Sequence, residues 1–157
     1  LDEGQVVGFG GLLDSRRFTV ALSSMGIKEE GMVLGEHGEN QVPVFSRLSV
    51  DVPEAVREEV LLGLRGSSMP VIKGKGGTVF GPAYHIANMM QKIEKGEEFI
   101  CSLPANGAYG IDGCSIGLPA RVTRNGAKIN ENLKLDDWET AKLNAAAEFL
   151  TGLCRRV

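Results

Sequence analysis

Paired cysteines are missing from this sequence. Its three cysteines, Cys101, Cys114 and Cys154, are far apart, and no C-x-x-C pair occurs. Neither a zinc knuckle nor a redox pair is therefore indicated. The pattern predicts three reduced thiols, which is the usual state of cysteine in a cytoplasmic protein.

Long apolar runs and an excess of positive charge are also lacking. No run approaches the roughly 20 apolar residues of a membrane span, and the formal net charge is −3. Neither a membrane nor nucleic acid is therefore an expected partner. The segment 1–4 (LDEG) has no apolar signal-peptide core and no initiator methionine, so we expect that a further segment precedes it. The 157 residues suit one domain, 1–157, with its own core.

No complete nucleotide-binding motif occurs. The segment 6–11 (VVGFGG) fails the spacing G-x-G-x-x-G, because Leu13 stands three residues after Gly10. We expect these glycines to let a helix N-terminus pack closely against another part of the backbone. The segment 73–78 (KGKGGT) is basic and flexible but lacks the phosphate-loop pattern G-x-x-x-x-G-K-[ST].

What the sequence does contain is a histidine between glycines, in the segment 35–40 (GEHGEN). The ordinary pKa of an imidazole lies near neutrality, so His37 is a natural proton donor or acceptor. A second segment, 13–18 (LDSRRF), places Asp14 and Arg17 three residues apart on one face of a predicted helix. Taken alone, that pair would be interpreted as a surface ion pair.

Together these two segments resemble the catalytic half of the malate and lactate dehydrogenase family. That family carries L-D-S-x-R-F and, later, G-x-H-G-(D/E). The resemblance continues through 75–78 (KGGT), 109–111 (YGI) and 117–119 (GLP), and so covers nearly the whole chain. Glu39 stands where an aspartate is common in the family. Arg16 is an additional cation beside Arg17, and we expect it to face solvent.

The resemblance implies a role for each matching residue. His37 would exchange the substrate's hydroxyl proton, and Asp14 would fix its tautomer and favour its protonated form. The guanidinium of Arg17 would hold the substrate carboxylate bidentately, and Thr78 would add a hydroxyl to the pocket wall. His85 has no Cys, Asp or Glu at ligand spacing, so it is predicted to be structural or on the surface, and no metal site is expected.

The resemblance also implies NAD or NADP as the hydride carrier, although the chain has no Rossmann domain and its cofactor-binding residues stay unknown. We therefore expect the C-terminal, substrate-binding and catalytic half of a two-domain, homo-oligomeric 2-hydroxy acid dehydrogenase that is inactive without its other half. Malate is preferred over lactate because segments 77–83 and 109–111 look malate-type. Two other interpretations are a non-catalytic scaffold module derived from this family and a metal-using NAD-dependent glycosidase, which would need a ligand cluster.

We expect an α+β fold, with about four helices packed on mainly antiparallel strands and the long helices on one side. One helix is expected at 13–25, and a second begins at a cap at Asp51 and weakens near 63–70. A third helix follows Pro82 and ends at Gly96, and a fourth runs from a cap at Asp136 to about Cys154. Strands are expected at 32–34, 42–45, 48–50, 99–103, 116–122 and 127–129.

The same periodicity predicts which helix faces are buried. The expected core positions are, along the chain, Phe18, Ala21, Leu22 and Met25; Val56, Val60, Leu61 and Leu64; Ala83, Ile86, Ala87 and Met90; and Trp138, Ala141, Ala145, Phe149 and Leu153. Arg57, Glu58 and Glu59 are assigned to a solvated face. Asn125-Gly126 predicts a hairpin with a type I′ turn, and residues 116–122 alternate as a half-buried strand does.

Overall fold

The computed structural model of the chain describes residues 3–155, so Leu1 and Asp2 of the predicted N-terminal boundary lie outside it. The described residues form five α-helices: α1 (Gly10–Ser24), α2 (Glu54–Gly66), α3 (Met69–Lys75), α4 (Phe80–Lys95) and α5 (Asp137–Cys154). They also form five strands: β1 (Val33–Gly35), β2 (Gln41–Pro43), β3 (Glu98–Pro104), β4 (Ser115–Thr123) and β5 (Gly126–Ile129).

The strands form one antiparallel sheet in the order β2-β1-β4-β3, with β5 paired to the end of β4. The two halves of the sheet join where Gly35 of β1 pairs with Gly117 of β4. A Cβ at Gly117 would lie 2.7 Å from the carbonyl oxygen of Gly35, closer than side chains tolerate. Glycine at this position therefore lets the strand that leads to His37 pair with β4.

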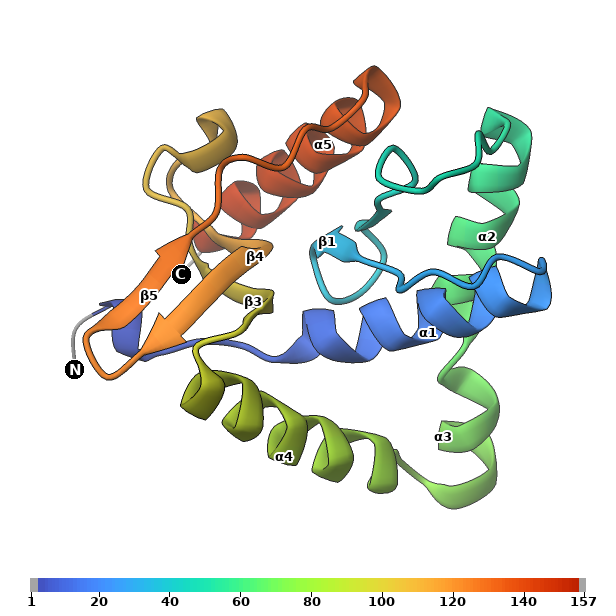
Figure 1. Cartoon of the computed structure of the whole chain (residues 1–157), viewed down its shortest axis with the longest axis horizontal. Coiled ribbons are helices and arrows are strands. Elements are labelled where there is room, and N and C mark those ends of the chain that lie inside the picture. The colour runs from blue at the N-terminus through green and yellow to red at the C-terminus, as the bar shows by residue number, and fades with distance from the viewer. Residues whose placement is uncertain (1–2, 156–157) are drawn as a thin grey trace.

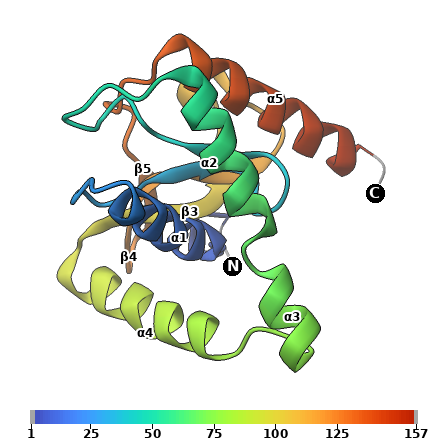
Figure 2. The ribbon, with the colours of Figure 1, turned by 90° about the vertical axis from the view of Figure 1, so that its right-hand side faces the viewer.

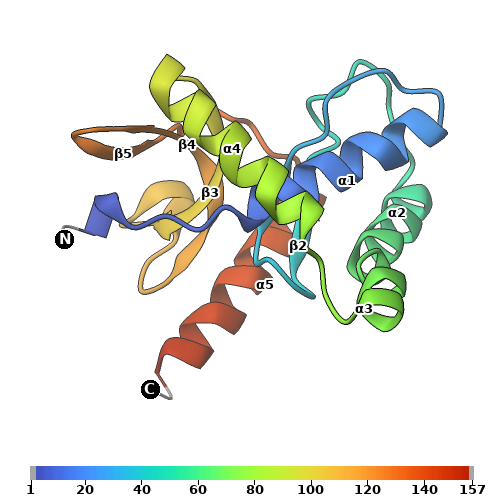
Figure 3. The ribbon, with the colours of Figure 1, turned by 90° about the horizontal axis from the view of Figure 1, so that it is seen from below.

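The helices cover both faces of the sheet. Figures 1 and 2 show α5 on one face, and α1 with α4 beneath it on the other. The expectation of an α+β fold with mainly antiparallel strands is confirmed, but the placement of all long helices on one side is wrong, because α5 packs against β2, β1 and β4 from the opposite side. Helices α2 and α3 follow one another at the end of the molecule beyond α1 (Figure 3).

Two buried clusters hold these layers together. The larger cluster contains the apolar side chains of β3 and β4 with Leu12 of α1 and Leu143 of α5. The smaller one contains Phe18, Leu22, Val33, Phe45, Val52 and Leu64 and joins α1 and α2 to β1. The two clusters meet along α1, so α1 is fixed on its apolar side by the whole core.

Several predicted boundaries differ from the structure. Residues 48–50 form no strand. The residue before α2 is Pro53, with no side-chain cap bond, so the cap expected at Asp51 is absent. Pro70 follows the end of α2 and lies in the first turn of a separate helix, α3. Its missing N–H has no cost there, because the first N–H groups of a helix have no partner within the helix. The helix expected after Pro82 begins earlier, at Phe80.

The predicted apolar faces hold for α1 and α2 but not for α4 and α5. Met25 is 40% exposed at the frayed end of α1, whereas Phe18 and Leu22 are fully buried. The predicted stripe of α4 is exposed, and His85 is its buried residue, with Met89 and Ile93 half-buried on the same face. The buried residues of α5 are Glu139, Leu143, Ala146 and Ala147. Of the predicted set, Trp138 is half-buried against the smaller cluster, and the other four residues are exposed.

Both discrepancies have a local chemical cause. Apolar residues lie on two faces of α4 and of α5, and periodicity alone does not decide which face meets the sheet. In α5 the deciding residue is Glu139, which is completely buried because its carboxylate accepts hydrogen bonds from the N–H groups of Phe45 and Ser46, each at 2.7 Å. The predicted capping box between Asp136 and Glu139 is confirmed.

Three smaller predictions also need correction. Arg57 is not solvated: it bonds to Asp136 and lies over the ring of Phe45, with its side chain 13% exposed. The hairpin at Asn125-Gly126 is present, but the positive φ lies at Gly126 (104°) and not at Asn125, so the turn is not type I′. In β4 residues 116–120 are all buried, because helices cover both faces of the sheet there.

Candidate active site

Asp14 lies in the second turn of α1, and its side chain is only 2% exposed. A buried carboxylate is stable only where hydrogen bonds or opposite charges satisfy it. Oδ1 accepts a hydrogen bond from Nη1 of Arg17 at 3.0 Å, and Oδ2 lies 2.6 Å from Nδ1 of His37. The structure thus brings together the three residues that the two sequence segments contribute.

His37 is held by a short loop between β1 and β2. The carboxylate of Glu36 accepts hydrogen bonds from the backbone N–H of Asn40 (2.9 Å) and from its side-chain amide (3.2 Å). The N–H of Glu36 donates to the carbonyl of Asn40 at 3.1 Å. Because these bonds close the loop on itself, the ring of His37 is presented at a fixed position above α1.

Gly10, the first residue of α1, lies directly under this ring. A Cβ built at Gly10 would overlap the His37 side chain, and one at Gly11 would overlap Ile100 of β3. The prediction that the glycines of segment 6–11 allow close packing against another backbone holds for Gly8, which exchanges two 2.8 Å backbone hydrogen bonds with Ser102 of β3. The nearest neighbours of Gly10 and Gly11 are instead the side chains of His37 and Ile100. Packed in this way, the two glycines do not form a phosphate-binding loop.

The electrostatics of the site favour a charged imidazole. The hydrogen bond that Asp14 accepts from the imidazole raises the pKa of His37 above its ordinary value of 6.5, and this effect outweighs burial and the nearby Arg17, which both lower it. The ring stays 47% exposed. Since Asp14 occupies Nδ1, the second ring nitrogen, Nε2, is the one left for proton exchange.

A cavity of about 550 Å³ contains His37, Arg17 and Thr78 in its lining. Thr78 is exposed and stands in the link between α3 and α4. Arg17 is 26% exposed and comes from α1. A guanidinium in this cavity can hold a carboxylate, and the neighbouring imidazole can move a proton beside it.

Two residues of this cavity were missed in the sequence. Gln41 of β2 is 4% exposed, and its Oε1 is buried with no hydrogen-bond partner in the described part of the chain. Nε of Arg65, on α2, is likewise buried and unpartnered there. Both line the cavity. For Gln41 the sequence offered a signal, because this polar residue alternates with the apolar Val42 just after the histidine loop. No sequence pattern indicated Arg65.

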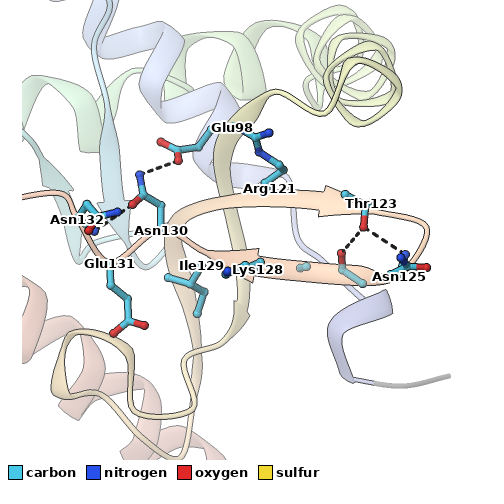
Figure 4. A pocket seen from close by; sticks show the side chains of 11 residues that line it. Glu98, Arg121, Thr123, Asn125, Lys128, Ile129, Asn130, Glu131 and Asn132 are labelled. Atoms are coloured by element: carbon cyan, nitrogen blue, oxygen red, sulfur yellow. Dashed lines mark hydrogen bonds between the residues drawn. The ribbon is translucent and has the colours of Figure 1, made fainter.

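A larger cavity, about 740 Å³, lies on the β4–β5 hairpin (Figure 4). Some of its lining residues bond to one another: the side-chain amide of Asn130 donates to Glu98 at 2.7 Å, and the backbone N–H of Asn125 donates to the hydroxyl of Thr123 at 3.2 Å. Its lining contains no histidine or cysteine. This cavity therefore offers neither an imidazole nor a thiol for catalysis.

Residues 3–155 were also compared with the requirements of a metal site, a membrane span and a reactive thiol. Within that range no group of three or more His, Cys, Asp or Glu side chains could hold a metal ion, and no helix is long and apolar enough to cross a membrane. Cys101, Cys114 and Cys154 are free thiols. Burial raises the pKa of the Cys101 thiol to about 12, so it is unreactive.

The buried Asp14 carboxylate joins a half-exposed imidazole to a guanidinium, an arrangement that can support proton transfer beside a bound carboxylate. The family model described as lactate/malate dehydrogenase, alpha/beta C-terminal domain, matches residues 12–155, and the chain belongs to this family. The malate preference implied by the sequence also agrees with the relatives that match it.

The malate dehydrogenase of Natronomonas pharaonis is 38% identical to the chain, over 96% of this chain and 53% of that protein. The L-lactate dehydrogenase of Macrococcus caseolyticus is 30% identical, over 98% of this chain and 54% of that protein. The structure of malate dehydrogenase from Archaeoglobus fulgidus in complex with NADH matches with a TM-score of 0.86 at 32% identity, over 99% of this chain and 54% of that chain. The chain thus spans about half the length of these relatives.

Proposed function

We propose that the chain is the substrate-binding and catalytic half of an NAD(P)-dependent 2-hydroxy acid dehydrogenase, with malate and oxaloacetate as the preferred pair. The observation that carries this proposal is the Asp14 carboxylate, which contacts His37 and Arg17 in one cavity. The choice of malate is supported by the higher identity to a malate dehydrogenase, 38% against 30% for a lactate dehydrogenase.

His37 performs the proton transfer in this proposal. When a 2-keto acid is reduced, hydride adds to the carbonyl carbon, and the imidazolium gives its Nε2 proton to the carbonyl oxygen. In the reverse direction the neutral imidazole takes the hydroxyl proton as hydride leaves the carbon. Asp14 keeps a proton on Nδ1 and stabilises the imidazolium, so the same contact serves both directions.

Arg17 binds the carboxylate that all 2-hydroxy acids share. Its bond to Asp14 uses Nη1, which leaves other N–H groups of the guanidinium free to form a bidentate pair with the substrate. The same bond limits the rotation of the side chain, so less entropy is lost when the substrate binds. The Thr78 hydroxyl, in the wall of the same cavity, contacts the substrate.

The residues of this chain fit the reacting end of a nicotinamide cofactor. His37 is half-exposed beside the cavity that contains Gly8, Phe9 and Pro82, where a flat ring has room. Bound there, nicotinamide supplies the hydride. Gly10 and Gly11 are packed under side chains and offer no pyrophosphate loop. We therefore assign the remaining cofactor contacts, and the choice between NAD and NADP, to a Rossmann half outside this chain.

The test is NADH and NADPH oxidation by the full-length protein with oxaloacetate and with pyruvate. We expect faster turnover of oxaloacetate, and a fall in kcat/KM of about 10²- to 10⁴-fold in His37→Gln, because general acid catalysis contributes about that much. Unchanged cofactor binding and thermal unfolding in the variant would locate the loss in the chemical step. Faster turnover of pyruvate would make the protein a lactate dehydrogenase, and no turnover of either acid would favour a scaffold.

The same assay distinguishes the isolated 157-residue chain from the full-length protein. We expect no NADH oxidation by the isolated 157-residue chain with either keto acid, since the described residues lack a pyrophosphate site. Measurable turnover by this chain alone would contradict the two-half proposal. We keep the prediction of a cytoplasmic location from the pattern of unpaired cysteines.

We also propose that the protein is a homo-oligomer. Helix α4 and the residue before it leave four large apolar side chains mostly exposed, Val79, Phe80, Tyr84 and Met90, at 70%, 82%, 65% and 59%. Exposed apolar groups of this size favour a covering surface. The molar mass of the intact protein in solution tests this, and a strictly monomeric mass would contradict it.

A further inference from the structure

The side chain of Glu36 closes the loop that carries His37, but it stays outside the catalytic cavity. The three residues that follow it, 37–39, line the cavity, whereas Glu36 does not. Its carboxylate instead binds Asn40, whose backbone N–H and side-chain amide both donate to Oε2, at 2.9 Å and 3.2 Å. A substrate bound in the cavity therefore has no contact with Glu36.

Two glycines allow the loop to close in this way. Gly35 has a left-handed φ of 88°, and a Cβ there would lie 2.5 Å from the carbonyl oxygen of Asn40. A Cβ at Gly38 would overlap Oε1 of Glu36. The N–H of Gly38 also donates to the carbonyl of Glu36 at 3.0 Å. The loop thus has room for the Glu36 carboxylate because glycine stands at both positions.

The imidazole of His37 needs two attachments to present Nε2 in one place. Asp14 holds the ring at Nδ1, at a distance of 2.6 Å, and this contact alone leaves the ring free to swing about that point. The second attachment is the backbone of His37, which lies between the two ends of the Glu36–Asn40 contact. Both ends of the side chain are fixed as a result. A catalytic group displaced by about 1 Å can lose about 10²-fold in rate.

The charge of Glu36 also acts on the ring. Both donors to its carboxylate are neutral N–H groups, and within residues 3–155 no cationic side chain forms an ion pair with it. Asp14 is the main cause of the raised pKa of His37, and the charge of Glu36 adds a smaller increase in the same direction. The other charged side chains around the cavity, from α1, the loop and α2, are Arg17, Glu39 and Arg65.

We propose that Glu36 is a positioning residue for the dehydrogenase reaction: by binding Asn40 it fixes the backbone of His37, and so the point at which Nε2 meets the reacting oxygen of the substrate. This inference rests on the proposed function, because Glu36 acts only through His37. Its effect falls on kcat rather than on KM, since Arg17, which binds the substrate carboxylate, belongs to α1 and not to the loop.

Two conservative variants of the full-length protein separate position from charge. Glu36→Asp keeps the charge but is one methylene shorter, so its carboxylate no longer reaches the N–H of Asn40. We expect its kcat with oxaloacetate to fall about 10- to 100-fold, with KM changed by less than about threefold and the pH dependence of kcat/KM unmoved.

Glu36→Gln keeps an acceptor oxygen at the same reach but has no charge. Because Oε1 of Glu36 accepts no hydrogen bond within residues 3–155, the new amide N–H₂ displaces no donor there. We expect this variant to retain most of kcat at low pH, where the imidazole is protonated in either protein. Its pH transition for reduction of the keto acid should move to lower pH, because a charge that favours the imidazolium is gone.

Glu29→Asp is the matched control. The Glu29 carboxylate also holds a loop, since it accepts the backbone N–H of Ser49 at 3.0 Å and the hydroxyl of the same residue at 2.7 Å. It lies outside the lining of the catalytic cavity. Shortening it tests whether loosening any surface loop slows catalysis, and kcat should stay within about twofold of the wild type.

Amide hydrogen exchange at Asn40 measures the loop contact without turnover. Exchange should be slow in the wild type and in Glu36→Gln, and faster in Glu36→Asp, because the N–H then loses its acceptor. This exchange pattern together with the loss of kcat in Glu36→Asp supports the inference. Thermal unfolding of both variants confirms that each is folded.

Three results would overturn the inference. One is a kcat of Glu36→Asp equal to that of Glu29→Asp, even with faster exchange at Asn40. The second is an equal loss of kcat in Glu36→Asp and Glu36→Gln at low pH, since charge rather than position would then be responsible. The third is a rise in KM alone. Turnover of neither keto acid by the wild type would instead contradict the proposed function, and the inference would fall with it.

Discussion

The buried carboxylate of Asp14 lies 2.6 Å from Nδ1 of His37, although 23 residues separate the two in sequence. The same carboxylate binds the guanidinium of Arg17 one helical turn away. One acidic group thus sets the protonation of one neighbour and the orientation of the other. The predictions below test this dependence and the packing that maintains it.

Asp14→Asn should shift the pH dependence of catalysis. Asp14 raises the pKa of His37, so in the wild type reduction of the keto acid declines, and oxidation of the hydroxy acid increases, only as pH rises through a value above 6.5. Without the carboxylate both transitions should move to lower pH, and kcat/KM should fall by about 10- to 100-fold. Profiles of kcat/KM against pH in both directions measure this, and unshifted transitions would mean that Asp14 does not control the protonation of His37.

The stability of the fold should also depend on pH through the raised pKa of His37. Because the pKa of His37 is raised in the folded state, its charged form stabilises the fold fully below about 6.5, and this contribution is lost as pH rises through the raised value. The difference in free energy of unfolding between the wild type and His37→Gln should therefore shrink as pH rises. Chemical denaturation at several pH values measures it, and a difference that grows with pH would contradict the sign.

Gly10→Ala should damage the site through packing. The added Cβ would overlap the His37 side chain, so the ring must move or the fold must strain, at about 1–3 kcal/mol. A displaced catalytic group costs about 10²-fold in rate per ångström. Steady-state kinetics and thermal unfolding measure the two effects.

Gly63→Ala is the matched control for that variant, because a Cβ at Gly63 on α2 meets nothing within 4 Å. It should stabilise the helix by about 0.5–1 kcal/mol and leave kcat/KM unchanged. Equal activity of the two alanine variants would show that Gly10 does not limit the position of His37.

Glu139→Gln should destabilise the protein without touching the active site. Oε1 of Glu139 accepts two backbone N–H groups, and Oε2 accepts the Ser46 hydroxyl at 2.6 Å and the Asp136 N–H at 3.1 Å. Glutamine has only one acceptor oxygen, so donors would face its amide group, at about 2–4 kcal/mol. Thermal unfolding checks this, with the exposed Glu148→Gln, expected within about 0.5 kcal/mol, as control. Equal melting temperatures would contradict the role of Glu139.

The arrangement within each site segment could be predicted because it is local, whereas the meeting of the two segments was implied only by the resemblance to the family. In 13–18 a helical spacing aligns Asp14 with Arg17, and in 35–40 the loop chemistry surrounds His37. Gln41 and Arg65 were not predicted, because their place in the cavity depends on how β2 and α2 pack rather than on a local pattern. The buried face of α4 depends likewise on how that helix packs, which buries His85.

The fold class and most element positions also followed from the sequence, since caps, glycines and alternation are local signals. The faces of α4 and α5 did not. For α5 the buried side is set by Glu139, whose backbone partners lie more than 90 residues earlier in the chain. A charged residue selects the core face here only because distant N–H groups satisfy it, and no window of neighbouring residues contains that information.

The bond between Ser46 and Glu139 spans 93 residues and fixes the segment that follows the His37 loop to a helix near the end of the chain. Contacts of such high sequence separation form late and slow the folding of a domain, because a long loop must close before they contribute. We therefore expect the segment that follows the His37 loop to gain this support late in folding, although it is synthesised early. A nascent chain that stops before α5 has every residue of the Asp14–His37–Arg17 group but not the framework that holds it.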